Sequence, residues 1–203
     1  IRICLVGSEM CIRDRDESGG GATASVPVLV GEPRDPDAPV PMPWWLYRDA
    51  GLGGPWVPTG WMGDVESMAL AVDETRDCAS PPSCIRVDIT TTGWVAMAWQ
   101  HPANNWGELP GGVDLSEAKR LVLKVRSEFD IDALTIGVGL ITDKQPHPDS
   151  LRVEKVVSTT DEWQTVRIRL RGDRSQVITG LYWALPPHLP EKNTIYLDDI
   201  RFE

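Results

Sequence analysis

Short segments in which apolar and polar residues alternate recur along most of the chain, and residues typical of turns separate them. In the segment CIRVDIT, Ile85, Val87 and Ile89 fall on one side of an extended strand and the polar residues on the other. The segments of this kind are 67–73, 84–90, 94–101, 121–128, 134–142, 151–158, 165–171, 180–185 and 194–202. Short strands at regular spacing predict an all-β fold, either a sandwich or a barrel.

The charge balance excludes some classes of partner. The chain has 20 Lys and Arg against 30 Asp and Glu, which gives a net charge of −10. This excess of acid argues against binding a nucleic-acid backbone and against a polybasic membrane contact. No segment approaches the roughly 20 apolar residues of a membrane-spanning helix. We therefore expect no nucleic-acid partner and no membrane span.

The first part of the chain differs from the rest. Residues 4–15, CLVGSEMCIRDR, resemble a sequencing-library adapter translated in frame, so residues 1–15 are interpreted as a non-native, assembly-derived segment. Residues 16–43 are rich in Gly, Pro, Ser and Asp and are predicted to be a flexible linker. Residues 44–203 are then the folded domain, and the linker is typical of a module tethered to a larger protein or a cell surface.

Two cysteines within the expected domain lie close together in the sequence. Cys78 and Cys84 flank the segment ASPPS between two expected strands, which favours a disulfide that closes a hairpin. The alternative is half of a metal site, but no His or second Cys pair is near enough in the sequence to complete zinc coordination. A disulfide predicts an oxidising compartment, so we expect a secreted or cell-surface protein.

The segment 93–112, GWVAMAWQHPANNWGELPGG, combines indole and amide side chains in a loop after a strand. Amides donate and accept hydrogen bonds, as hydroxyl-rich ligands require, and an indole face suits the C–H face of a sugar ring. The alternative is a loop whose Asn residues bond its own backbone while Trp106 closes the core. The candidate ligand-binding residues are Trp94, Gln100, His101, Asn104, Asn105, Trp106, Lys124, Arg126 and Tyr182.

Small residues are expected on one face of the same sheet. The alternation places Trp94, Ala96, Ala98 and Gln100 on that face, together with Gly137, Gly139, Tyr182, Ala184, Lys124 and Arg126. A floor of Ala and Gly leaves space either for a chain ligand or for a covering segment. The competing cover is the lead-in that contains Trp44, Trp45 and Trp56.

The sequence offers little for catalysis. The three His residues, His101, His147 and His188, lie in Pro-rich loops, and no nucleophile, zinc-protease or phosphate-loop motif is present. Glu108 and Asp114 could act as a glycosidase pair only at a separation that the sequence does not give. We predict no catalytic residues and favour binding over catalysis.

Five further segments stand out: PTGWMGD at 58–64, WQHPANNWG at 99–107, GGVDLSEAKRL at 111–121, DEWQTVRIRL at 161–170 and IYLDDIRFE at 195–203. Together they resemble secreted carbohydrate-binding modules of the β-jelly-roll, galactose-binding-like type. The resemblance covers about 44–203. It implies a jelly-roll β-sandwich of two antiparallel sheets, a poly- or oligosaccharide partner, and a sugar site on the concave sheet face or in the edge loops.

Acidic residues near both ends of the expected domain are candidate ligands of a structural Ca²⁺. Asp64, Asp198 and Asp199 provide the hard oxygens that Ca²⁺ prefers, although an acidic strand end is also a common way to prevent edge-to-edge aggregation. In the resembling modules the final strand often provides an Asp to calcium, with a partner near the domain start. The resemblance therefore implies a calcium site formed by Asp64 with Asp198 or Asp199.

Three functions remain open on the sequence. The first is non-catalytic polysaccharide binding. The second is a glycan-active enzyme, a glycoside hydrolase or polysaccharide lyase, on the same fold. The third is a structural or adhesive surface domain, for which the segment from Trp44 to Trp56 would cover the face near Gly137.

Overall fold

The structure, a computed structural model, describes residues 2–6, 9–15, 21–27, 42–49, 51–187 and 192–203. For the first three of these ranges it describes the backbone alone. The chain divides into two compact units, Ile1–Pro39 and Val40–Glu203. Each unit is described by itself.

The first unit contains a three-stranded antiparallel sheet in the order β1-β2-β3. Its strands are β1 (Arg2–Val6), β2 (Glu9–Arg15) and β3 (Gly21–Pro27). β3 lies within the predicted linker 16–43, where we did not expect a strand. The other residues of that segment up to 41 lie outside the described ranges, and the boundaries at 15 and 43 stay predictions.

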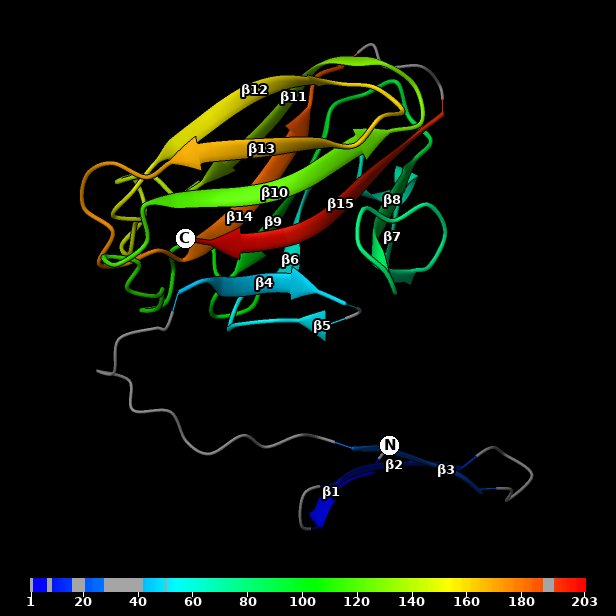
Figure 1. The fold of residues 1–203 in the computed structure, drawn as a ribbon. Helices are drawn as coiled ribbons and strands as arrows, with labels where there is room; N and C mark the ends of the chain where they lie inside the picture. Colours follow the sequence, from blue (N-terminus) through cyan, green and yellow to red (C-terminus); the bar gives the residue numbers. More distant parts are fainter. Residues whose placement is uncertain (1, 7–8, 16–20, 28–41, 50, 188–191) are drawn as a thin grey trace. The chain divides into compact units, whose positions relative to one another are not determined.

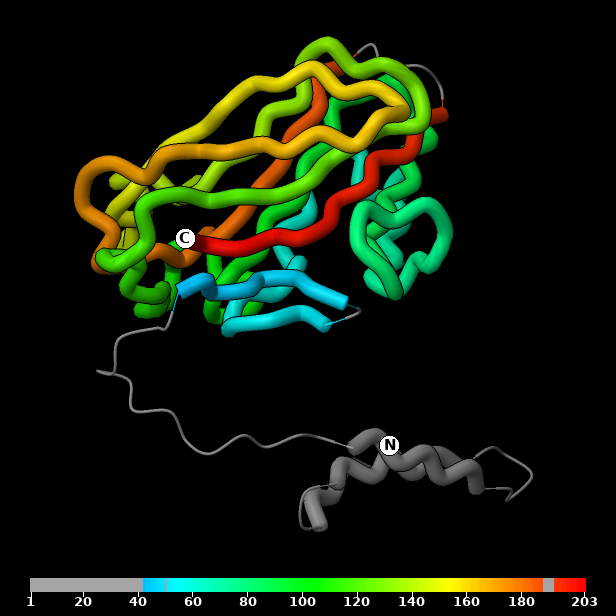
Figure 2. Tube along the Cα trace, viewed as in Figure 1, coloured from blue at the N-terminus to red at the C-terminus, as the bar shows by residue number. Residues whose placement is uncertain are grey.

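The second unit is a jelly-roll β-sandwich of two antiparallel sheets (Figure 1). One sheet has five strands in the order β12-β11-β14-β9-β6, and the other has seven. In the seven-stranded sheet β15 pairs with β10 on one edge and with β8 and β4 on the other, and Figure 2 shows it lying between β10 and β4. The elements are β4 (Trp44–Arg48), β5 (Gly51–Leu52), β6 (Val57–Gly63), the 3-10 helix η1 (Val65–Ser67), β7 (Met68–Glu74), β8 (Cys84–Ile89), β9 (Val95–Gln100), β10 (Arg120–Ser127), β11 (Ile131–Val138), β12 (Val153–Thr159), β13 (Gln164–Arg169), β14 (Thr179–Leu185) and β15 (Asn193–Phe202).

Alternation along the strands builds the core between the two sheets. In β9, Val95, Met97 and Trp99 face the interior, and Trp183 of the neighbouring β14 packs in the same cluster. The seven-stranded sheet contributes residues such as Phe202, and all of these side chains are buried. The core thus uses one face of each sheet and leaves the two outer faces available for function.

All nine expected strands are confirmed, with ends shifted by a few residues. The strands β4, β5 and β6 were not among them, because the Gly and Pro residues between 51 and 60 interrupt any clear alternation. Before β10 the chain makes a simple turn, in which Ala118 N donates to Leu115 O at 2.9 Å. Within the described ranges no helix has the length and apolar character needed to cross a membrane.

The predicted disulfide is confirmed. Cys78 and Cys84 are bonded, with their Cα atoms 5.4 Å apart. Cys84 begins β8, and Cys78 lies in the connection from β7. The bridge therefore closes the hairpin that the sequence indicated.

Candidate functional site

The outer face of the five-stranded sheet contains a central row that Tyr182 dominates. The row consists of Gly60, Ala98, Tyr182, Gly137 and Glu154, each paired with the next across neighbouring strands. A Cβ added to Gly137 would lie 2.4 Å from the Tyr182 ring, so this ring lies across the glycine. The Tyr182 hydroxyl donates to Glu154 Oε2 at 2.6 Å, and only 3% of the residue is exposed.

This arrangement corrects the prediction that Tyr182 is an open contact for a ligand. Burial, together with the hydrogen bond to Glu154, raises the pKa of its hydroxyl above the usual value, so the hydroxyl stays protonated and bonded to Glu154. Ala98 and Gln100, the other predicted floor residues in this part of the face, are fully buried. The part of the face around Tyr182 is therefore closed.

The next row of the same face has short side chains in its middle. It consists of Met62, Ala96, Ala184, Thr135 and Val156, again paired strand to strand across the whole sheet. We call it the small-residue row. Of its middle three residues Ala96 is buried and Ala184 and Thr135 are half-buried, and Val156 at one end is 58% exposed. At about 4.8 Å between strands, five strands span roughly 19 Å, the scale of several linked sugar rings.

Trp94 lies directly before β9 at the end of the sheet nearest the small-residue row. Its side chain is 50% exposed, which is unusual for so large an apolar group. A Cβ on Gly63 would lie 3.2 Å from the Trp94 ring, so the ring rests against the backbone of β6. Within the described ranges its indole N–H has no hydrogen-bond partner. Trp94 is thus an accessible and supported aromatic surface.

The amides of the loop after β9 are used by the protein itself. Asn105 is buried; its Oδ1 accepts from Gly107 N at 3.0 Å and Leu109 N at 3.2 Å, and its Nδ2 donates to Leu109 O at 2.9 Å. Gln100 Nε2 donates to Asn105 O at 3.0 Å. Burial and these internal bonds disfavour the prediction that Gln100 and Asn105 bind a ligand and favour the alternative of a self-satisfied loop for these two residues.

The remaining predicted residues of this loop lie nearer the surface. Trp106 is half-buried, and its Nε1 donates to Asn104 Oδ1 at 3.1 Å. Asn104 is exposed, and its own N–H donates to Thr59 Oγ1 at 2.8 Å. His101 is half-buried at the end of β9. Trp106 is absent from the core cluster, so it does not close the core.

Trp94 and the Trp106 loop lie at opposite ends of β9. The six residues of this strand separate them, which at about 3.4 Å per residue is roughly 20 Å. The segment 93–112, which we predicted to form one site, therefore contributes residues to two separate parts of the surface. Accessibility and a free N–H favour the Trp94 end.

Lys124 and Arg126 were assigned to the wrong sheet. They lie on β10, in the seven-stranded sheet, and so cannot share a face with Trp94. Lys124 Nζ is 2.9 Å from Asp199 Oδ2, and the Arg126 guanidinium lies 3.9 Å from the Tyr196 ring centroid. Alternation separates inner from outer residues but does not say which sheet a strand joins.

The tryptophans of the lead-in do not cover the Gly137 face. Trp44 and Trp45 lie on β4, which pairs with β15 in the seven-stranded sheet. Trp56 is fully buried in the core, 5.0 Å from the Trp44 ring and 5.5 Å from Phe202. The cover expected for an inert scaffold is therefore not formed by these residues.

The proposed calcium ligands do not form a suitable site. Within the described ranges no three His, Cys, Asp or Glu side chains gather as metal ligands, so Asp64 is not joined with Asp198 and Asp199. Asp198 Oδ2 accepts from Ser80 N at 2.8 Å. Asp199 pairs with Lys124, a cation where Ca²⁺ would have to bind. These residues do not fit calcium, and the expectation of a structural calcium ion has no support from them.

The electrostatics of the Asp pair agree with this reading. Burial raises the pKa of Asp198. Burial also opposes ionisation of Asp199, but hydrogen bonds from Ser80 and Lys124 and the charges of Lys124 and Arg201 together lower its pKa. The pair thus holds the connection after β7 against β15 through Ser80 and Lys124.

Comparison with known proteins supports the fold. No family model and no curated protein matches the chain. A family 30 carbohydrate-binding module matches with a TM-score of 0.54 and 20% identity, over 77% of this chain and 85% of that one. The family 30 module of a Clostridium thermocellum cellulosomal cellulase, Cel9D-Cel44B, matches with a TM-score of 0.55 and 19% identity, over 78% and 95%.

A third structure, from a study of promiscuous specificity in carbohydrate-binding modules of the β-sandwich superfamily, matches with a TM-score of 0.51 and 14% identity. That match covers 96% of this chain and 73% of the other. The chain therefore has the β-sandwich fold of carbohydrate-binding modules, as its sequence segments suggested.

Proposed function

We propose that this protein is a non-catalytic module that binds polysaccharide through Trp94 and the small-residue row. The observation that carries the proposal is the accessible Trp94 ring, held against Gly63 at the end of a row of short side chains. An indole face stacks on the apolar C–H face of a sugar ring, and its free N–H can donate to a hydroxyl. The shared fold with carbohydrate-binding modules supports this choice of ligand.

In this proposal the glycan chain lies along the small-residue row. Ala96, Ala184 and Thr135 are short enough to let a flat polymer lie close to the sheet, between Met62 and Val156. Thr135 adds a hydroxyl, and Asp64, exposed beside Trp94, adds a carboxylate. An exposed site of this kind is wet and shallow, so we expect weak affinity, with dissociation constants from micromolar to millimolar.

The protein is proposed to act outside the cytoplasm. The disulfide between Cys78 and Cys84 supports an oxidising compartment. A polysaccharide ligand suits the same location, since such polymers are found in cell walls and in the extracellular matrix. Tethering to a larger protein through residues before 44 remains part of the proposal.

Isothermal titration against β-glucan, xylan, mannan and alginate tests the binding function. We expect saturable heat with at least one of them, and no new reducing ends after incubation. Absence of heat with every polymer, for protein shown by circular dichroism to be folded, would contradict the proposal. New reducing ends would replace it with a glycan-cleaving enzyme.

A further inference from the structure

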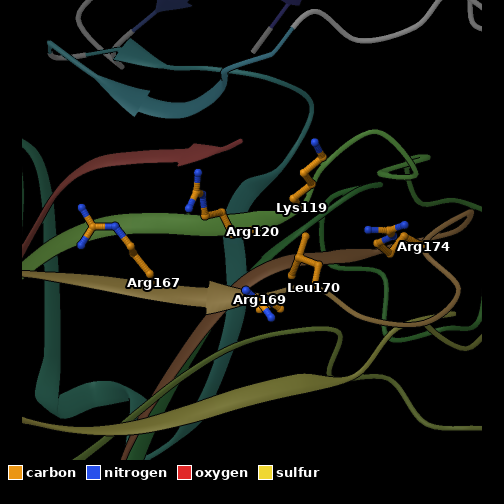
Figure 3. A pocket seen from close by; sticks show the side chains of 6 residues that line it. All are labelled: Lys119, Arg120, Arg167, Arg169, Leu170 and Arg174. Carbon is orange, nitrogen blue, oxygen red and sulfur yellow. The ribbon is translucent and has the colours of Figure 1, made fainter.

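The outer face of the seven-stranded sheet contains a pocket with a strongly basic lining. The pocket has a volume of about 600 Å³, within the usual range for ligand sites. Figure 3 shows the side chains that line it: Lys119, Arg120, Arg167, Arg169, Leu170 and Arg174. Five of these six residues are cations, although the whole chain has a net charge of −10.

The strand pairing concentrates these charges. Arg167 and Arg169 of β13 both point outward, because Val166 and Ile168 face the core. Arg120 of β10 lies directly opposite Arg169 in the register of the two strands. Like charges at such positions destabilise a sheet, so this pair opposes folding in the free protein. An oxyanion between the two guanidinium groups would remove this repulsion.

Few carboxylates neutralise the cluster. Arg120 Nε lies 2.8 Å from Glu203 Oε2, but the same carboxylate also pairs with Arg201 at 2.6 Å. Within the described part of the chain, Lys119, Arg167 and Arg169 have no ion-pair partner, and all three are exposed. Three free cations and one shared one therefore face the pocket.

The wall of the pocket is fixed by backbone hydrogen bonds. Leu170 N donates to Lys119 O at 2.9 Å, and Leu115 N donates to Arg174 O at 2.8 Å. Arg174 Nη1 donates to Ala118 O at 2.7 Å, while its enclosed Nε has no protein partner. The connection after β13 is thus tied to the turn before β10, and the cations are held in a defined arrangement.

The geometry points to a second ligand site here, one for an anionic polysaccharide whose carboxylate or sulfate groups pair with Arg167, Arg169 and Arg120. Guanidinium groups bind both oxyanions through two parallel hydrogen bonds. Successive outward residues of β13 are about 6.7 Å apart, so the cations form a series that suits repeated charges on one polymer. The choice of a polysaccharide as the carrier of these charges rests on the proposed function.

A nucleic acid fits this pocket less well. None of the six lining residues is aromatic, so no base can stack there. A long phosphate backbone would also have to pass the acidic remainder of a chain with net charge −10. We therefore treat nucleic-acid binding as an outcome that would overturn the proposal.

Affinity electrophoresis and titration of the full chain with polygalacturonate and with dextran sulfate test the site. The double variant R167Q/R169Q should bind the preferred polymer about tenfold or more weakly than the wild type. The matched control K144Q/K155Q, which removes two exposed Lys charges from a loop and a strand of the other sheet, should stay within about twofold. Raising NaCl to about 0.5 M should weaken wild-type binding strongly.

The two polymers separate a carboxylate from a sulfate ligand, and binding of either supports the proposal. Equal affinity of R167Q/R169Q and wild type, binding of neither polymer by folded protein, or tighter binding of poly(dT) would overturn it. Neutral glycans distinguish this site from that of Trp94: R167Q/R169Q should bind them normally. Wild-type protein that binds a neutral glycan but neither acidic polymer would overturn only the pocket. Wild-type protein that binds an acidic polymer through Arg167 and Arg169 but no neutral glycan would overturn only the Trp94 site.

Discussion

Asn105 shows how one amide can suggest a ligand site and yet serve the protein. Its side chain takes the place of a backbone partner in this loop. Its Oδ1 accepts from the N–H groups of Gly107 and Leu109, and its Nδ2 donates to the Leu109 carbonyl. The sequence shows that an amide is present but not whether its partner is a ligand or the adjacent backbone. Only the fold of the loop decides this, and it shows that the amides of Gln100 and Asn105 bond the protein itself.

Replacing Asn105 by Ala should therefore affect stability. The variant would leave the buried Gly107 N–H and the partly buried Leu109 N–H without an acceptor, which costs about 1–3 kcal/mol of unfolding free energy. Urea denaturation measures the difference, with Glu108→Ala in the exposed part of the same loop as a control. An Asn105→Ala protein as stable as the control would contradict the assigned hydrogen bonds.

The Glu74 carboxyl has a lowered pKa because its neighbours donate hydrogen bonds to it. A hydrogen bond from the Arg76 side chain, with others from the backbone of Arg76 and Thr75, lowers its pKa from 4.5 to about 2. Because the pKa is lower in the folded state, the stabilisation is complete above pH 4.5 and is lost as the pH falls toward 2.

The variant Glu74→Gln should consequently be less stable than wild type at pH 7, with a difference that shrinks as the pH falls toward 2. Urea denaturation at a series of pH values measures this convergence. A stability difference that is independent of pH would show that the ionised carboxylate contributes nothing.

The pairing of β10 with β13 has a consequence for the free protein. Since Arg169 faces Arg120 across the two strands, Arg169→Thr should raise the unfolding free energy by about 0.2–1 kcal/mol at low salt. High salt should reduce the gain, because it screens the repulsion. Arg171→Thr, beyond the end of β13, is the control. A loss of stability in Arg169→Thr would contradict the like-charge pair.

The β7–β8 hairpin depends on its disulfide. The double variant C78S/C84S releases a short loop, so the unfolding free energy should fall by roughly 2 kcal/mol on the loop-entropy account. Thermal unfolding monitored by circular dichroism measures the change. An unchanged melting temperature would mean that the pairing of β7 with β8 holds the hairpin without the bridge.

More of the fold than of the candidate site could be predicted from the sequence. Alternation located nine strands and their inner faces, because burial imposes a period of two on each strand by itself. It could not place Lys124 and Arg126, since the choice of sheet depends on partners far away, such as Tyr196 opposite Arg126. It also could not show that Tyr182 folds across Gly137 and closes that part of the face.

The two outer faces of the sandwich carry different side chains. The five-stranded sheet has an accessible indole and short side chains, which suit a neutral glycan. The seven-stranded sheet has the basic pocket, which suits an acidic one. If both proposed sites bind, one module could hold a neutral and an acidic polymer at the same time.

Titration of Trp94→Ala and Trp106→Ala with the best-bound neutral glycan tests the central claim most directly. Trp94→Ala should weaken binding about tenfold or more, since the stacking surface is lost. Trp106→Ala should stay within about twofold of wild type, because its ring is held by Asn104 at the far end of β9. Wild-type affinity in a folded Trp94→Ala protein would contradict the account.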